Sequence, residues 1–157
     1  MTTRIFTHPF IGIDSNPTGT IASNTAIPAD GTFTDISSSA MSCVLEQTVN
    51  VSEGSPFGSE YTTQVPGRIT GNLTIEFYTD YGATEAVNVL IPLLRQIVRV
   101  KLRPNPTGAT TEAQGATNPE FMFDAVVAAV PSFNAGDDIA QQSVSWPTTG
   151  LVRFDAS

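Results

Sequence analysis

The sequence has little of what most catalytic and metal sites need. It contains one cysteine, Cys43, and one histidine, His8, in 157 residues. A single cysteine excludes an intrachain disulfide, and a single histidine nearly excludes a zinc site or a nucleophile–base pair. Cys43 lies in an apolar alternation, so we predict a buried thiol rather than a reactive one. His8 stands beside Pro9, with no cysteine or second histidine to share a metal.

The sequence motifs of common enzyme families are missing too. There is no Gly-x-Ser-x-Gly elbow, no Gly-x-x-x-x-Gly-Lys loop, no Gly-x-Gly-x-x-Gly and no His-Glu-x-x-His. Glu46 and Glu76 would form a glycosidase-like pair if they met across paired strands, but no aromatic platform for a sugar accompanies them. Asp137 and Asp138 are adjacent and point apart on an extended chain, which favours a solvated loop over a metal site. We therefore predict a structural or binding protein without a cofactor or metal, not an enzyme.

Charged residues are scarce, at 14%, and acidic ones outnumber basic ones by 15 to 7, for a net charge of -8. Proteins that bind nucleic-acid phosphates tightly need clustered Lys and Arg. The excess of acidic residues therefore argues against tight binding of nucleic acid, but not against DNA that passes close by. No stretch of 18 consecutive apolar residues occurs, and the N-terminus lacks an apolar run typical of a signal peptide. We expect a soluble protein that has no membrane segment and is not exported through a signal peptide.

The basic residues gather in one place. Arg95, Arg99, Lys101 and Arg103 lie within nine positions. One interpretation is a solvated strand edge, which positive charge protects from pairing with other edges. The other is an inter-subunit contact with an acidic face of a neighbouring subunit.

What the sequence does contain is Ser, Thr, Asn and Gly, a composition that favours strands and turns. We predict one mainly β domain, long enough to bury its own core. Apolar and polar residues alternate over 41–52 and again over 68–78, which predicts two half-buried strands placed side by side. Their polar sides carry hydroxyl, amide and acidic groups: Glu46, Thr48, Asn50, Ser52, Thr70, Asn72, Thr74 and Glu76.

A long loop at 53–67, with three Gly and two Pro, joins these two strands. Loops of this length in compact domains are usually functional or mobile. Phe57, Tyr61 and Val65 have no obvious intramolecular partner. They either fold back over the core or insert into another subunit, and we favour the second interpretation.

The remaining segments complete the prediction. Residues 1–40 suggest an extended N-terminal arm with one or two short strands, and 104–119 a surface loop. Helical spacing over 83–96 predicts a helix that stops or kinks near Pro92. Further strands are expected over 97–103, 120–130, 139–146 and 151–155. The strand 120–130 is apolar on both faces and should therefore be covered on both, and Pro147 should end the strand 139–146.

Three segments carry a resemblance to a known family. They are 60–67 (Glu-Tyr-Thr-Thr-Gln-Val-Pro-Gly), 71–80 (Gly-Asn-Leu-Thr-Ile-Glu-Phe-Tyr-Thr-Asp) and 131–137 (Pro-Ser-Phe-Asn-Ala-Gly-Asp). Their order, with a strand, a long loop, a strand and a helix before a late strand, resembles the major tail tube proteins of long-tailed, siphovirus-like bacteriophages. These belong to the wider family of phage tail tubes and injection-system tubes.

The resemblance implies a single tail-tube domain over 1–157, a β-sandwich or partly open β-barrel flanked by one helix. It implies hexameric rings stacked into a tube, with the long loop bridging rings and a polar, acidic lumen that conducts DNA from capsid to host. The polar residues of 41–52 and 68–78 would line this lumen. Implied partners are other copies of the chain and the tape measure, terminator and distal tail proteins, and the implied location is the virion tail, assembled in the host cytoplasm. The alternative is a virion decoration or baseplate β-sandwich module that binds carbohydrate or a receptor through the long loop.

Overall fold

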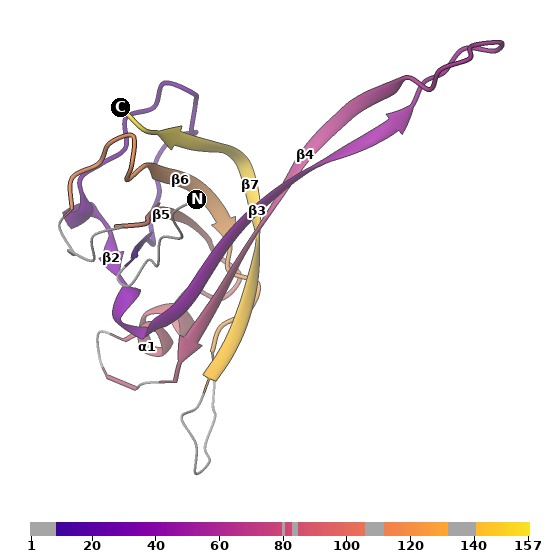
Figure 1. Ribbon diagram of the computed structural model, residues 1–157. Coiled ribbons are helices and arrows are strands. Elements are labelled where there is room, and N and C mark those ends of the chain that lie inside the picture. The colour runs from indigo at the N-terminus through magenta and orange to yellow at the C-terminus, as the bar shows by residue number, and fades with distance from the viewer. Residues whose placement is uncertain (1–8, 80, 83–84, 106–111, 132–140) are drawn as a thin grey trace, which may run out of the picture.

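The computed structural model describes residues 9–79, 81–82, 85–105, 112–131 and 141–157. These residues form one antiparallel sheet of seven strands in the order β2-β1-β5-β6-β7-β4-β3 (Figure 1). The strands are β1 (Phe10–Asp14), β2 (Thr34–Asp35), β3 (Ala40–Glu53), β4 (Gln64–Tyr78), β5 (Ile97–Arg103), β6 (Glu120–Val126) and β7 (Gln141–Asp155). The end strands β2 and β3 do not pair with each other, so the sheet is open. The predicted mainly β fold is confirmed.

The sheet has two halves, and strand β7 belongs to both. Its first part pairs with β4 up to Pro147, and from Thr148 onward it pairs with β6. The prediction that Pro147 ends a strand is therefore wrong, because the chain changes neighbour there and stays extended. At this crossing a Cβ on Gly71 would collide with the side chain of Thr148, so only glycine fits.

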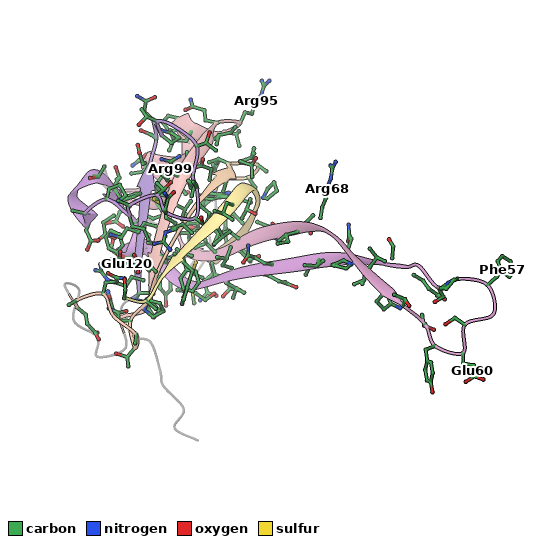
Figure 2. All side chains as sticks on the ribbon, turned by 90° about the horizontal axis from the view of Figure 1, so that it is seen from above. Phe57, Glu60, Arg68, Arg95, Arg99 and Glu120 are labelled. Atoms are coloured by element: carbon green, nitrogen blue, oxygen red, sulfur yellow. The ribbon has the colours of Figure 1, made fainter. Side chains whose placement is uncertain are left out.

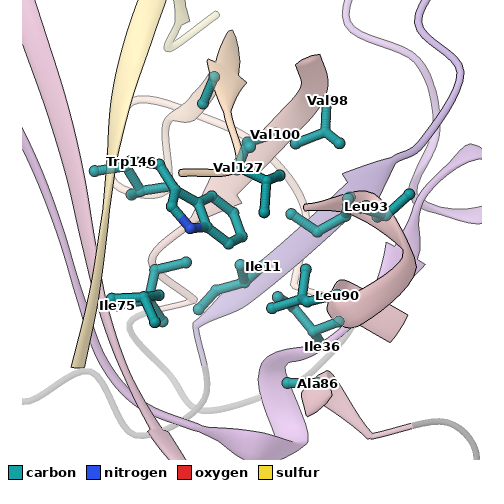
Figure 3. Packing of buried hydrophobic residues seen from close by; sticks show 14 of the residues in the cluster. Ile11, Ile36, Ile75, Ala86, Leu90, Leu93, Val98, Val100, Val127 and Trp146 are labelled. Atoms are coloured by element: carbon teal, nitrogen blue, oxygen red, sulfur yellow. The ribbon is translucent and has the colours of Figure 1, made fainter. Parts of the chain in front are cut away.

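The hydrophobic core lies between the two halves of the sheet (Figure 3). Trp146, Phe77 and Phe123 are its largest fully buried side chains, and the Trp146 Nε1 donates a 2.6 Å hydrogen bond to the Ala129 carbonyl. Buried apolar residues of the helix α1 (Ala86–Leu90) cover one end. The helix gives way to a 3-10 turn over Ile91–Leu93 that contains Pro92, which confirms the predicted stop.

Residues 9–39 belong to the body of the protein. The expected short strands are present as β1 and β2, and Ile11, Ile13 and Ile36 enter the main core. The segment between β1 and β2 lies over the other face of the sheet, where a second cluster joins Phe10, Ile21, Phe33 and Met122. Strand β6 is thus covered on both faces, as its two apolar sides predicted.

Three of the four clustered basic residues are buried on β5. Arg99 pairs with Asp124 at 2.8 Å. Lys101 and Arg103 share Asp30, each at 2.8 Å, and Glu120, at 3.2 and 3.0 Å. The prediction of a solvated strand edge is wrong for Arg99, Lys101 and Arg103, because β5 is an internal strand and residues 15–33 cover this face. Their charges are neutralised within the chain, and Arg95 alone of the four is exposed.

Strands β3 and β4 form a hairpin that projects from the body (Figure 1). The predicted side-by-side pairing is confirmed, with Glu46 opposite Asn72 and Thr48 opposite Thr70. The ladder continues to the pair Glu53 and Gln64, so the connecting loop covers 54–63 instead of the predicted 53–67. We call residues 46–70 the hairpin arm and residues 54–63 its tip.

Candidate functional site

The polar residues of the two strands lie on one side of the hairpin. Cross-strand contacts tie them together: the hydroxyls of Thr48 and Thr70 are 3.0 Å apart, and the Ser42 hydroxyl donates to Glu76 at 3.0 Å. Alternation along β3 keeps the predicted residues Asn50 and Ser52 on the same side. We call this surface the polar face. Its predicted members are Glu46, Thr48, Asn50, Ser52, Thr70, Asn72, Thr74 and Glu76.

Strand β7 widens the polar face. Ser143 lies opposite Glu76 and Ser145 opposite Thr74, and the Asn72 side-chain amide donates to the Ser145 hydroxyl at 2.5 Å. Sequence reasoning found the alternation in β7 but not its place next to β4, since the two strands are far apart in the chain. The polar face therefore spans three strands and presents hydroxyl, amide and carboxylate groups. Val44, which lies opposite Thr74 and is 56% exposed, is an apolar residue on the same side.

Glu46 and Glu76 do not form a catalytic pair. Glu46 lies opposite Asn72, and Glu76 is four residues further along the same strand, roughly 13 Å away at 3.3 Å per residue. Carboxylates of glycosidases lie within about 9.5 Å of each other. Within the described segments, no three Asp, Glu, His or Cys side chains are grouped to hold a metal. His8, Asp137 and Asp138 lie outside the described residues.

Both sides of the hairpin arm are open to solvent. Every residue from Glu46 to Thr70 is exposed except Ser55, which is half-buried. On the side opposite the polar face, Val49, Val51 and Ile69 are 43%, 58% and 66% exposed. A two-stranded hairpin alone is marginally stable in water, so this arm has the character of a surface that another molecule covers.

The edges of the arm are unpaired as well. β3 has β4 as its only neighbour in the described sheet, and β4 pairs with β7 only from Asn72 to Tyr78. The segment 64–71 of β4 therefore has a bare outer edge, and β3 has one along its length. Bare edges of this length bind other strands unless something covers them.

The arm tip carries the most exposed aromatic side chains. Phe57 is 112% exposed and Tyr61 is 81% exposed, while Val65 at the tip's base is half exposed. Internal hydrogen bonds define the loop: the Ser59 hydroxyl donates to the Tyr61 carbonyl at 2.8 Å, and the Thr63 N–H donates to the Ser55 hydroxyl at 2.9 Å. The alternative that these residues fold back over the core is wrong, because the tip stands clear of the body (Figure 2).

Two of the described basic residues are exposed, one on the arm and one on the body. A β-bulge places Gly67 and Arg68 opposite Asn50, and the Arg68 side chain projects from the arm (Figure 2). Arg95 projects from the body. Among the residues that the structure describes, Arg68 and Arg95 are the basic side chains for which no ion pair is found.

An apolar groove of about 500 Å³ lies at the root of the arm, between β3 and the strands β1, β5 and β6. Phe10, Cys43, Leu45 and Phe121 are among its lining residues. Cys43 was predicted to be buried and is half-buried at the wall of this groove. Its partial burial raises the pKa of Cys43 to about 12, so this side chain is a protonated thiol at neutral pH. In the described part of the chain, no helix has the length and apolar character to span a membrane.

Fold and surface together define a mainly β protein with an uncovered hairpin arm that has two bare edges. No protein-family model and no curated protein sequence matches this chain. Among solved structures, it is similar to a chain of the structure titled "Virion of native gene transfer agent (GTA) particle", with a TM-score of 0.59 and 8% sequence identity. The similarity covers 98% of this chain and 100% of that chain. At this identity the likeness shows a shared fold.

Proposed function

We propose that this chain is the structural subunit of a bacteriophage-like tail tube, in which stacked hexameric rings conduct DNA from capsid to host cell. The observation that carries the proposal is the polar face, which runs without a break from the three-stranded body onto an arm with two bare edges. The similarity to a virion chain over nearly the whole length supports it. The chain would then reside in the virion tail after assembly in the host cytoplasm, with tape measure, terminator and distal tail proteins as partners.

The bare edges provide the ring contact. When hairpins stand side by side around a ring, β3 of one copy lies next to the 64–71 segment of β4 in the next copy, and the two run antiparallel. Each contact covers one bare edge on each of the two neighbouring subunits, and closure of the ring leaves no bare edge. Such head-to-tail contacts close into rings when the rotation per subunit allows it.

The polar face suits the wall of a DNA channel. Proteins hold DNA mainly through Lys and Arg contacts to phosphates, and each contact must break before the DNA moves on. The polar face offers mainly hydroxyls and amides instead, and its carboxylates Glu46 and Glu76 repel phosphate. Arg68, which lies opposite Asn50 at the β-bulge, is the one basic residue of β3 and β4. DNA therefore meets few attachment points along this wall.

Negative-stain microscopy of the purified protein tests the assembly. We expect rings or tubes with a central hole. Dispersed monomers or trimers at all concentrations would contradict the tube and favour the decoration or baseplate module that binds carbohydrate or a receptor.

The orientation of the arm needs a second test with matched cysteine variants in a Cys43→Ala background. In tubes, Thr48→Cys on the polar face should react with a small maleimide but not with one attached to a polymer too large for the bore. Val49→Cys, on the opposite side of the same strand, should be covered by protein and react with neither. Rapid reaction of Thr48→Cys with the large reagent in intact tubes would show that the polar face does not line the channel.

A further inference from the structure

The turn that follows α1 exposes an apolar surface with an arginine at its centre. Ile91, Leu94 and Ile97 are 48%, 44% and 52% exposed, and Arg95 lies between them in the chain. We call these four residues the corner. Apolar residues around an exposed arginine are typical of the centre of protein–protein interfaces.

Backbone hydrogen bonds tie the corner to the residue that follows β6. The Arg95 N–H donates to the Val127 carbonyl at 2.9 Å, and the Val127 N–H donates to the Gln96 carbonyl at 2.9 Å. Arg95 has a φ of 75°, in the left-handed region that favours glycine. A side chain in this conformation costs about 1 kcal/mol, so the sequence places an arginine where glycine would be easier to accommodate. A hydrogen-bonded, strained position of this kind suits a contact residue.

The arm tip has the complementary chemistry. Phe57 and Tyr61 are its bare aromatic side chains, and the carboxylate of Glu60 lies next to Tyr61 in the chain. In the described residues, no hydrogen bond or ion pair to the Glu60 side chain is found. Figure 2 shows Phe57 and Glu60 at the far end of the arm and Arg95 on the body, so the tip does not reach the corner of its own chain.

We propose that the arm tip of one copy docks on the corner of a second copy, with Glu60 paired to Arg95 and the tip aromatics packed on the exposed aliphatic side chains. This inference rests on the proposed function and adds the receiving surface for the tip. Tip and corner are different surfaces, so the contact runs head to tail and repeats from copy to copy. Each subunit gives one tip and receives one.

A charge swap tests the pairing. Glu60→Arg and Arg95→Glu, each alone, should raise the protein concentration needed for tubes about tenfold, because like charges then face each other in the contact. The double variant should return this concentration to near the wild-type value. Sedimentation and negative-stain microscopy measure assembly, and circular dichroism checks that each variant is folded.

The outcomes separate this inference from the function on which it rests. Wild-type protein that forms no rings or tubes overturns the tube proposal and the docking with it. Normal wild-type tubes, together with single variants that assemble equally well or a double variant no better than the single ones, overturn the docking alone.

A disulfide test locates the tip directly. In a Cys43→Ala background, Glu60→Cys with Arg95→Cys should give a ladder of covalent multimers when assembled protein is oxidised by copper–phenanthroline. Absence of the ladder in assembled protein contradicts the docking. A ladder from Glu60→Cys with the native Cys43 as the only other thiol would place the tip in the groove at the arm's root and overturn the proposal.

Discussion

Removal of the arm tip should separate folding from assembly. Deletion of residues 55–62 leaves Gly54 and Thr63 as a two-residue turn between Glu53 and Gln64, which are already paired in the ladder. A glycine at the first position of such a turn matches the type II′ geometry that hairpins prefer. The ladder of β3 and β4 is therefore kept, and only the exposed loop is lost.

The two effects differ in size. The deleted residues are not packed on the core. Shortening the loop from ten residues to two reduces the entropic cost of closing it, so the free energy of unfolding should stay equal or rise by about 1 kcal/mol. Assembly loses the burial of Phe57 and Tyr61, worth about 1.5–3 kcal/mol for each side chain. Together these predict an assembly constant roughly a hundredfold to ten-thousandfold lower per docked tip.

Urea denaturation measures the first effect, and sedimentation with negative-stain microscopy at rising concentration measures the second. The point variant Phe57→Ser with Tyr61→Ser is the matched control, since it keeps the loop length and should show the same assembly defect. Tubes of normal length from the deletion variant at wild-type concentration would refute the role of the tip. Loss of folding in the deletion variant would refute its independence from the core.

Three further predictions concern the body of the protein. Glu120→Gln leaves the buried Lys101 and Arg103 with Asp30 as their remaining shared carboxylate, and should lower the free energy of unfolding by about 3 kcal/mol in urea titrations. Burial raises the pKa of Asp30, but hydrogen bonds from Arg103 and Lys101 outweigh it, and the net shift is below the ordinary value of 3.8. Asp30 thus adds stability above pH 3.8 that is lost as the pH falls through its folded-state pKa, and Asp30→Asn should make the urea midpoint less sensitive to pH between 5 and 2. Cys43, with a pKa of about 12, should react slowly with a thiol reagent at pH 8 until denaturant is added, and prompt reaction of the folded protein would contradict the raised pKa.

The central strands were predictable because one of their sides is buried. Leu73, Ile75 and Phe77 face the core, and their spacing fixed both the strand and the identity of its polar side. The stop of the helix at Pro92 followed from local chemistry in the same way. Most of the polar face was therefore visible in the sequence.

The features that the sequence did not reveal depend on distant contacts. In the arm both sides are exposed. The outer end of the β3–β4 ladder, where residues 51–53 pair with 64–66, therefore has no buried side whose apolar spacing would show how far the two strands extend. On β5 the alternation of aliphatic and basic residues is typical of a solvated side. It is buried only because Asp30, more than seventy positions earlier, returns with its segment to cover it. Interior cations are recognisable only when their carboxylate partners are known.

The sharing of β7 between the two halves of the sheet also decides how the protein responds to force. A pull on the projecting hairpin acts along β4, parallel to its ladders with β3 and β7, so that many backbone hydrogen bonds resist sliding at the same moment. Beyond Pro147 the same strand passes the load to β6 and the body. The hairpin is thus anchored in shear, an arrangement suited to a part that carries tension.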